Sequence, residues 1–200
     1  SDKSLEAIGY TEHSFAHVEE TAHTAAMILR ELGYSDRETE LAMIAGFLHD
    51  IGNIINRADH AQSGAVMAFR LLDRLNMPAS EICSIISAIG NHDEKTAQPV
   101  DAISAALIIA DKTDVRRSRV RNTTLTSFDI HDRVNYAVTE SLLRIDDEKK
   151  FVKLELTVDT SYGSVMEYFE IFMERTRMSK YAAKYLNIWF EIIINDTRLL

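Results

Sequence analysis

The sequence predicts a mainly α-helical protein, with a helical bundle in residues 1–122 and a small α+β module of ββαβ order in residues 123–200. Up to Asn122 the apolar residues recur at the spacing of helices. After Asn122 one segment changes to the two-residue alternation of a strand. Only two prolines and seven glycines occur, and there is no repeat or low-complexity stretch. We therefore expect two domains, a larger helical one and a smaller mixed one.

The first two helices are bounded by residues that favour helix ends. Residues 18–32 carry an apolar residue at every third or fourth position, and Gly33 follows as a C-cap. Ser35 and Glu38 have the spacing of a capping box, which predicts that the next helix begins there and ends near Gly52.

Three more helices are predicted before Asn122. One runs from about residue 59 to 76, and Pro78 separates it from the fourth. The fourth has one apolar face, made by Ile82, Ile85, Ile86 and Ile89. Cys83 lies within this apolar pattern, so we interpret it as a core thiol. The fifth helix, residues 101–114, is the most apolar of the chain.

The last 78 residues follow a different pattern. The segments 133–145 and 151–159 flank a charged turn, which indicates a β-hairpin. A long helix is predicted over 164–186 and a final strand over 188–195. The aromatic residues of the long helix are interpreted as core: Tyr168, Phe169, Phe172, Tyr181 and Tyr185.

Composition excludes several functions. A net charge of −9 argues against binding to a nucleic acid polymer or an anionic membrane. The longest apolar stretch is too short to span a bilayer, and no signal peptide is expected at the start. The single cysteine rules out an internal disulfide and suits the cytoplasm. An anionic substrate would need a metal ion or a local basic patch.

Three His-Asp pairs occur, and one of them has an unusual setting. His49-Asp50 ends an apolar helix, where two adjacent polar groups would be costly to bury without partners. His131-Asp132 follows a polar loop and is interpreted as a surface pair. His17, His60, His92 and Asp111 are also polar residues that lie in or directly beside predicted helices with an apolar face. Imidazoles and carboxylates that converge from five helices suit Fe, Mn, Zn or Co, and an aspartate can bridge two such ions.

The ordered set His17, His49-Asp50, His60, His92 and Asp111 resembles the two-metal form of the HD phosphohydrolase superfamily. The local sequences agree around residues 47–52, at Gly64-Ala65 after His60, and at Ala110-Asp111. The spacing from His17 to Leu32-Gly33 is similar to that in cyclic-dinucleotide phosphodiesterases, and the basic stretch after Asp111 is similar to that in diadenosine tetraphosphate hydrolases. The resemblance covers about residues 11–122.

The resemblance implies a role for each ligand. One metal would be held by His17, His49, Asp50 and Asp111. Asp50 would bridge to a second metal, held by His60 and His92. A hydroxide formed on the metals would attack phosphorus while the metals stabilise the developing charge. Two divalent ions are expected, Fe or Mn first, with Zn, Co or Ni as alternatives.

Other residues extend the predicted site or depart from the family pattern. Where many relatives have a lysine, this chain has Asn53, which offers hydrogen bonds without charge. The paired histidines and the glycine-tyrosine-proline signature of the cyclic-dinucleotide enzymes are missing at Asn91-His92. Arg116 and Arg117 are the predicted phosphate contacts in a basic stretch that also contains Lys112, Arg119 and Arg121. His13 is a weaker candidate for a substrate contact.

We therefore predict a metal-dependent phosphohydrolase that cleaves a phosphate ester or anhydride of a nucleotide or another small phosphorylated metabolite. Asp50, Asn53, Arg116 and Arg117 are the predicted catalytic residues. Two alternatives stay open: a di-iron oxygenase of the HD fold, and a catalytically silent nucleotide-binding sensor. The C-terminal module would cover the site, select the substrate or form a homodimer through an exposed strand edge.

Overall fold

The computed structural model describes residues 15–94, 97–122 and 128–200 and confirms the mainly α fold class. The helices are α2 (Phe15–Glu31), α3 (Asp36–Leu48), α4 (His60–Arg74), α5 (Ala79–Gly90), α6 (Ala102–Thr113), α7 (Ile130–Ala137) and α8 (Val165–Tyr185), with short 3-10 turns η1 (Ile51–Ile54) and η2 (Arg117–Arg119). The strands are β1 (Val138–Ile145), β2 (Phe151–Val158), β3 (Trp189–Ile194) and β4 (Thr197–Arg198).

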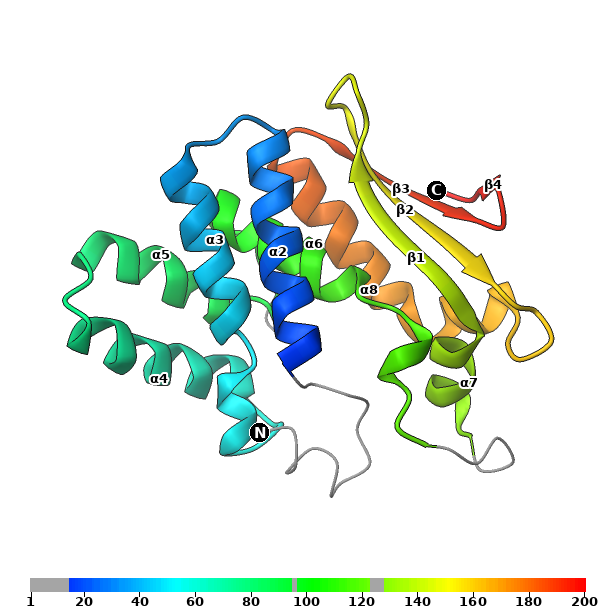
Figure 1. The fold of residues 1–200 in the computed structure, drawn as a ribbon, viewed down its shortest axis with the longest axis horizontal. Helices are drawn as coiled ribbons and strands as arrows, with labels where there is room; N and C mark the ends of the chain where they lie inside the picture. Colours follow the sequence, from blue (N-terminus) through cyan, green and yellow to red (C-terminus); the bar gives the residue numbers. More distant parts are fainter. Residues whose placement is uncertain (1–14, 95–96, 123–127) are drawn as a thin grey trace.

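The helical part is built around α2, α3 and α6, with the α4–α5 hairpin on one side (Figure 1). Gly46 allows α2 and α3 to approach closely, because a Cβ atom there would lie only 2.5 Å from the Cα atom of Ala22. The first turn of α2 carries His17, and His49 follows Gly46 by three residues. The small residues at this contact therefore set the distance between two predicted metal ligands.

The predicted end of α2 and the predicted start of α3 are confirmed, whereas α3 ends at Leu48 and not near Gly52. Gly33 follows α2 with φ of 86°, a backbone conformation that glycine adopts without strain. The Ser35 hydroxyl accepts a hydrogen bond from the Glu38 backbone N–H at 3.2 Å, and Glu38 accepts one from the Ser35 N–H at 2.9 Å. This is the reciprocal capping box that the sequence predicted.

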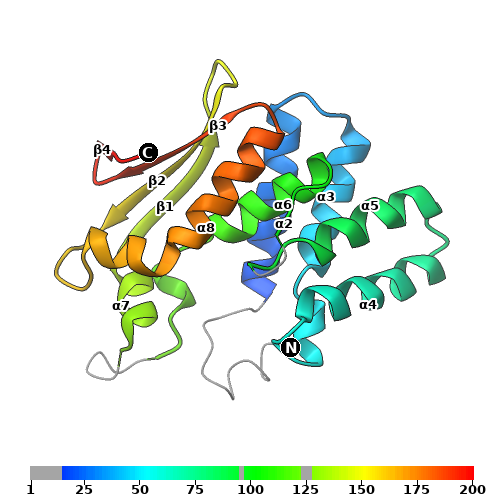
Figure 2. The ribbon, with the colours of Figure 1, turned by 180° about the vertical axis from the view of Figure 1, so that it is seen from behind.

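The four strands form one sheet in the order β1-β2-β3-β4. β1 and β2 are an antiparallel hairpin, as predicted, and α8 connects β2 to the parallel strand β3. In Figure 2, α8 lies between the sheet and α6, against which it packs. One continuous apolar cluster includes residues of both parts, such as Leu107 of α6 and Phe172 of α8. The division into two domains at residue 122 remains a prediction.

Three local predictions were wrong. Residues 133–137, expected to begin a strand, belong to α7, which is capped by the Asp129 side chain and buries Val134 and Ala137 on one face. Cys83 is exposed, because it lies on the outer side of α5 while Ile82 and Ile85 face inward. Of the five aromatic residues of α8, Tyr168 and Phe172 are buried and Phe169 is partly buried against the core, as predicted, whereas Tyr181 and Tyr185 are exposed.

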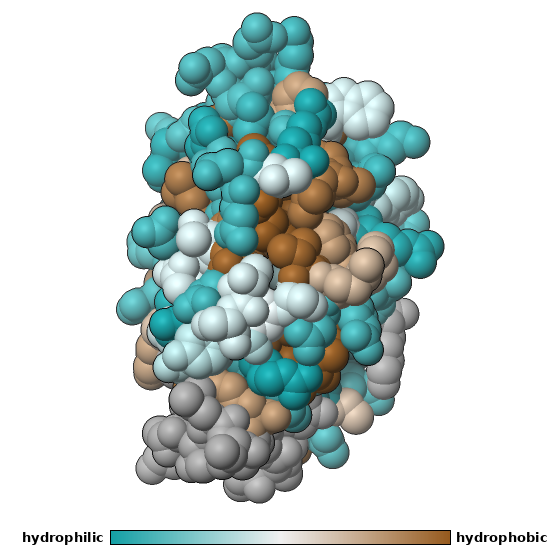
Figure 3. All heavy atoms as spheres, turned by 90° about the vertical axis from the view of Figure 1, so that its right-hand side faces the viewer, coloured by the Kyte–Doolittle hydropathy of each residue, from teal (hydrophilic) through white to brown (hydrophobic). Residues whose placement is uncertain are grey.

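The side of the molecule that carries the sheet has apolar atoms near its middle, surrounded by hydrophilic ones (Figure 3). Leu142 of β1 and Trp189 of β3 are large exposed side chains of this sheet. β1 is an edge strand, paired only with β2 in the described sheet. In the part of the chain that the structure describes, no helix combines the length and apolar character needed to cross a membrane.

Candidate metal centre

The structure brings the six predicted ligands together at the centre of the helical part. They come from five places: His17 from the first turn of α2, His49 and Asp50 from the link between α3 and η1, His60 from the start of α4, His92 from just beyond α5, and Asp111 from the end of α6. All four imidazoles are buried, with at most 1% of their surface exposed. Ligand atoms lie within 4.8 Å of one another in two overlapping triads, His17-His49-Asp111 and His49-Asp50-His92.

Backbone carbonyl groups orient three of the imidazoles in the same way. The Nδ1 atoms of His49, His60 and His92 lie 2.7, 3.0 and 2.6 Å from the carbonyl oxygens of Gly46, Arg57 and Ile89, each three residues earlier. A carbonyl oxygen can only accept, so each Nδ1 donates its proton. In the neutral ring the lone pair then lies on Nε2, which is the atom that faces the centre.

The carboxylate of Asp50 faces two different pairs of imidazoles with its two oxygens. Its Oδ2 lies 3.8 Å from Nε2 of His17 and 3.6 Å from Nε2 of His49. Its Oδ1 lies 3.4 Å from Nε2 of His60 and 4.0 Å from Nε2 of His92. Each oxygen of Asp50 thus faces its own pair of imidazoles, and the bridging role that the resemblance assigned to Asp50 remains a prediction.

Two features of these imidazoles fit a cation between them. Nε2 of His60 lies 3.2 Å from Nε2 of His92, and both atoms present lone pairs when the two Nδ1 atoms donate. Two lone pairs at this distance repel each other, and a positive charge between them removes the repulsion. Nε2 of His49 is buried and makes no hydrogen bond to any residue that the structure describes. These Nε2 atoms and the carboxylates form a donor set suited to a divalent transition metal.

Asp111 presents one oxygen to the centre and the other to a lysine. Its Oδ1 lies 3.4 Å from Nε2 of His17 and 3.8 Å from Nε2 of His49. Its Oδ2 lies 2.6 Å from Nζ of the buried Lys112. Burial alone would raise the pKa of Asp111, but Lys112 and the hydrogen bond with His17 outweigh it and hold this pKa well below its usual value. Asp111 is therefore ionised and able to bind a cation, and Lys112, an alternative phosphate contact in the sequence, is engaged with it.

The pKa shifts of the histidines predict how the metal-free protein responds to acid. Burial lowers the pKa of His49, of His60 and, to about 3, of His92. Below a pH of about 6.5 these three take up protons only when the chain unfolds, so stability falls as the pH falls. His17 has the opposite sign: burial lowers its pKa, but Asp111 and Asp114 outweigh this and raise it, which favours the folded state in acid. The shift of His92, to about 3, acts in the same direction as those of His49 and His60, so we expect a lower Tm in EDTA at about pH 5.5 than at about pH 7.5.

This expectation is checked by calorimetry of the metal-free protein across that pH range. The variant His92→Gln removes the imidazole with the most strongly lowered pKa and should show a weaker pH dependence than the parent protein. A Tm that stays constant or rises on acidification would contradict the assignment of neutral, buried imidazoles.

Sequence reasoning missed the residue that orients His17. Nδ1 of His17 lies 2.6 Å from Oδ2 of Asp114, a buried carboxylate. Burial would raise the pKa of Asp114, but His17 and the buried Arg119 outweigh it and lower this pKa. The Arg119 Nη1 donates to the Asp114 backbone carbonyl at 2.9 Å and lies 3.4 Å from Oδ2. Asp114 follows Asp111 by three residues, a spacing that places both near one side of the chain, and this is the signal that could have identified it.

The variant Asp114→Asn tests this orienting contact. It keeps the size of the side chain but removes the charge that fixes His17, so we expect Mn²⁺ affinity to fall by about 10- to 100-fold. Isothermal titration with Mn²⁺ measures the change. Asp73→Asn, at an exposed aspartate of α4, is the matched control and should bind Mn²⁺ as the parent does. Equal affinity in both variants would show that Asp114 has no such role.

Asn53 and Arg57 lie beside the centre. Asn53 is buried in η1, and its Oδ1 accepts a hydrogen bond from Nη1 of Arg57 at 3.3 Å. The Nδ2 atom of Asn53 has no hydrogen-bond partner among the described residues. The predicted position of Asn53 at the site therefore agrees with the geometry, while its contact with substrate remains a prediction. Arg57 was not singled out from the sequence.

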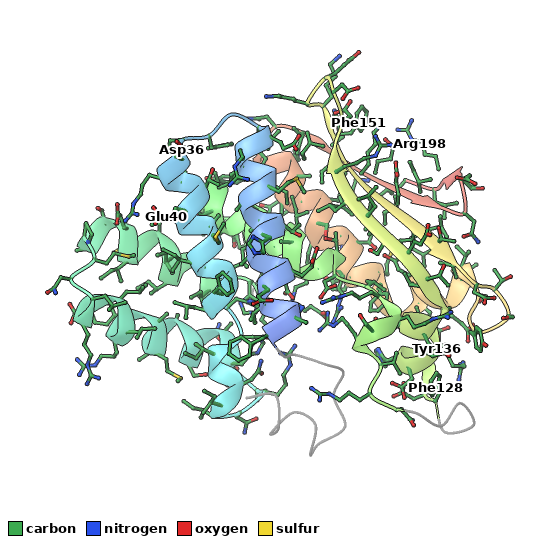
Figure 4. The ribbon with its side chains drawn as sticks, viewed as in Figure 1. Asp36, Glu40, Phe128, Tyr136, Phe151 and Arg198 are labelled. Carbon is green, nitrogen blue, oxygen red and sulfur yellow. The ribbon has the colours of Figure 1, made fainter. Side chains whose placement is uncertain are left out.

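The structure places the two predicted phosphate-binding arginines differently. Arg116 donates from Nε to Oδ1 of Asp114 at 2.8 Å, which keeps it one side chain away from His17. Arg117 turns toward the C-terminal module: its guanidinium lies 4.3 Å from the ring centre of Tyr136, which Figure 4 shows at α7 beside Phe128. For Arg117 this contact provides a structural role, and a phosphate contact stays a prediction for both residues. His13 lies outside the described residues.

Comparison with known proteins gives a family for this arrangement. The family described as HD domain matches residues 14–116, which contain all six predicted ligands. The chain belongs to the HD domain family. This is the superfamily of metal-dependent phosphohydrolases, whose members bind divalent metals, and the resemblance predicted from the sequence is confirmed.

Individual relatives within this family are distant. Ribonuclease Y of Aliarcobacter butzleri is 30% identical over 122 residues, which cover 60% of this chain and 21% of the relative. Ribonuclease Y of Staphylococcus epidermidis is 31% identical over 119 residues, again 60% of this chain and 21% of the relative. The uncharacterized protein MJ1020 of Methanocaldococcus jannaschii is 21% identical over 194 residues, 86% of this chain and 74% of the relative. The chain thus spans about a fifth of the ribonucleases, whereas its similarity to MJ1020 extends into the C-terminal module.

Proposed function

We propose that this HD-domain protein is a phosphohydrolase with two divalent transition metal ions, acting on a phosphate ester or anhydride of a nucleotide or another small phosphorylated metabolite. The carboxylate of Asp50 carries the proposal, because its two oxygens face separate pairs of imidazoles. A carboxylate with ligands on both sides suits a bridge between two cations.

The residues divide into two ligand groups. His17, His49, Asp50 and Asp111 would hold one ion, and His60 and His92, with Asp50, would hold the other. The mixture of imidazole and carboxylate suits Fe or Mn first and accommodates Zn, Co or Ni. When bound, such ions lower the pKa of water and stabilise negative charge on a phosphoryl group.

The protein's own groups supply orientation and charge balance. Asp114 and three backbone carbonyls keep the Nε2 atoms directed at the centre, and Lys112 neutralises the outer oxygen of Asp111. Asn53 provides a buried Nδ2 donor for a water or a phosphate oxygen. Arg116, with its side chain 29% exposed, would contact a phosphate at the rim of the site.

We propose a small substrate because a net charge of −9 disfavours a nucleic acid polymer. The single cysteine suits the cytoplasm, and the β1 edge offers a surface for a homodimer. The relatives named Ribonuclease Y make RNA the obvious competing substrate to include in a test.

The test is hydrolysis by protein loaded with Mn²⁺ or Fe²⁺, with nucleotides, sugar phosphates, cyclic dinucleotides and a short oligoribonucleotide as substrates. Released phosphate is measured for the nucleotides and sugar phosphates, and chromatography of the products detects phosphodiester cleavage in the other two. Each reaction is run in air and without oxygen, with an oxygen electrode on the aerobic sample. We expect oxygen-independent hydrolysis of at least one small substrate. Oxygen consumption would instead establish an oxygenase, preferential cleavage of the oligoribonucleotide would make RNA the substrate, and tight nucleotide binding without turnover would indicate a sensor.

A further inference from the structure

Arg57 occupies a distinctive position beside the candidate metal centre. It lies in the segment between η1 and α4, and 24% of its side chain is exposed. Its Nη1 atom lies 3.5 Å from Oδ1 of Asp50, 3.3 Å from Nε2 of His60 and 3.3 Å from Oδ1 of Asn53. One cationic group therefore touches a predicted ligand carboxylate, a predicted ligand imidazole and the buried amide.

The contact with His60 conflicts with binding of a cation by the same ring. Nδ1 of His60 donates to the backbone carbonyl of Arg57 at 3.0 Å, so Nε2 carries the only lone pair of the neutral ring. The Nη1–H of Arg57 is directed at that lone pair. A lone pair that accepts an N–H cannot at the same time bind a metal ion, and a guanidinium repels a divalent cation at the same oxygen of Asp50.

We infer that Arg57 holds the position of the second cation until that cation binds, and then turns to a phosphate oxygen of the substrate. The inference rests on the proposed two-metal function. The exposed quarter of the side chain gives the guanidinium a path outward, and its remaining N–H groups match the geometry of a phosphate. A phosphate between the cation and Arg57 is attracted by both, so substrate and second cation should bind cooperatively.

The variant Arg57→Gln separates the two roles, and Arg57→Ala serves if the glutamine variant does not fold. In the absence of substrate, titration with Mn²⁺ should show a second binding event about 10-fold tighter than in the parent, because the competing charge is gone. The first binding event should be unchanged. In the Mn²⁺-loaded protein, the affinity for inorganic phosphate should fall by about 10- to 100-fold.

Arg70→Gln is the matched control, since Arg70 is an exposed arginine of α4, and it should leave both measurements unchanged. If parent and variant bind two Mn²⁺ ions with equal affinities, or if phosphate binding does not weaken, the inference about Arg57 is overturned while the two-metal proposal stands. If parent and variant each bind only one Mn²⁺ ion, the two-metal proposal fails and takes this inference with it.

Discussion

Replacing Asp50 by asparagine is expected to lower kcat/KM for phosphate release by about 1,000-fold and to reduce bound Mn²⁺ from two ions to one or none. The physical reason is that the two oxygens of this carboxylate face two different groups of predicted ligands. Its Oδ2 faces His17 and His49, and its Oδ1 faces His60 and His92. An amide of the same shape has no charge and only one oxygen that can coordinate a metal ion. It therefore cannot bridge two cations. Metal analysis of dialysed protein and steady-state kinetics measure the two effects.

The control for this variant is Asp132→Asn, in the other His-Asp pair that the structure describes away from the centre. His131 of that pair is exposed, as predicted, and Asp132 accepts a hydrogen bond from Nδ2 of Asn122 at 3.3 Å. Metal content and activity should be unchanged. If Asp50→Asn retained two ions, the bridging role would have to be abandoned.

Adding a methyl group at Gly52 is expected to have the second large effect. It should lower both the stability of the protein and its binding of the second metal ion. A Cβ atom there would lie 2.0 Å from the backbone oxygen of His60 and 2.7 Å from the backbone nitrogen of Gly64. Neither atom can move without shifting the start of α4, which carries His60. We expect Gly52→Ala to lower the free energy of unfolding by about 2 to 3 kcal/mol and to abolish binding of one Mn²⁺ ion. Urea unfolding and Mn²⁺ titration provide the measurements.

A variant of Ser63 distinguishes a clash with the backbone from a clash with a side chain. The Oγ of Ser63 would also lie close, at 2.6 Å from the added Cβ. Ser63→Ala removes that hydroxyl, so the single variant should bind metal normally. The double variant Gly52→Ala/Ser63→Ala should remain as impaired as Gly52→Ala, because the backbone contacts persist. Recovery of metal binding in the double variant would show that the backbone approach is not what positions His60.

The six predicted ligands could be selected from the sequence because a polar group in an apolar helical pattern is costly to bury without a partner. His92 and Asp111 continue apolar helical faces, and His49-Asp50 ends an apolar helix, so each position needs a partner that the local sequence does not supply. The structure brings these groups together. The capping box of Ser35 and Glu38 could also be predicted from the sequence, because the two residues are only three positions apart.

What the sequence hides are contacts whose partners lie far apart or in irregular segments. Asp114 contacts His17 across 97 positions; its spacing from Asp111 could mark it as a residue near the centre, but that spacing does not indicate His17 as its partner. Arg57 lies in a polar loop, where arginine is common, so the sequence gives no sign that it contacts Asp50. Arg117 is a predicted phosphate contact because its neighbours are basic, and the sequence did not indicate the contact of its guanidinium with the ring of Tyr136, nineteen residues away.

Anomalous X-ray diffraction from crystals of the Mn²⁺-loaded protein tests the central claim most directly. Two anomalous peaks are expected, one on each side of the Asp50 carboxylate: the first beside His17, His49 and Asp111, and the second beside His60 and His92. A single peak bound by all four imidazoles, or no peak at Asp50, would contradict the account of a bridged pair of cations.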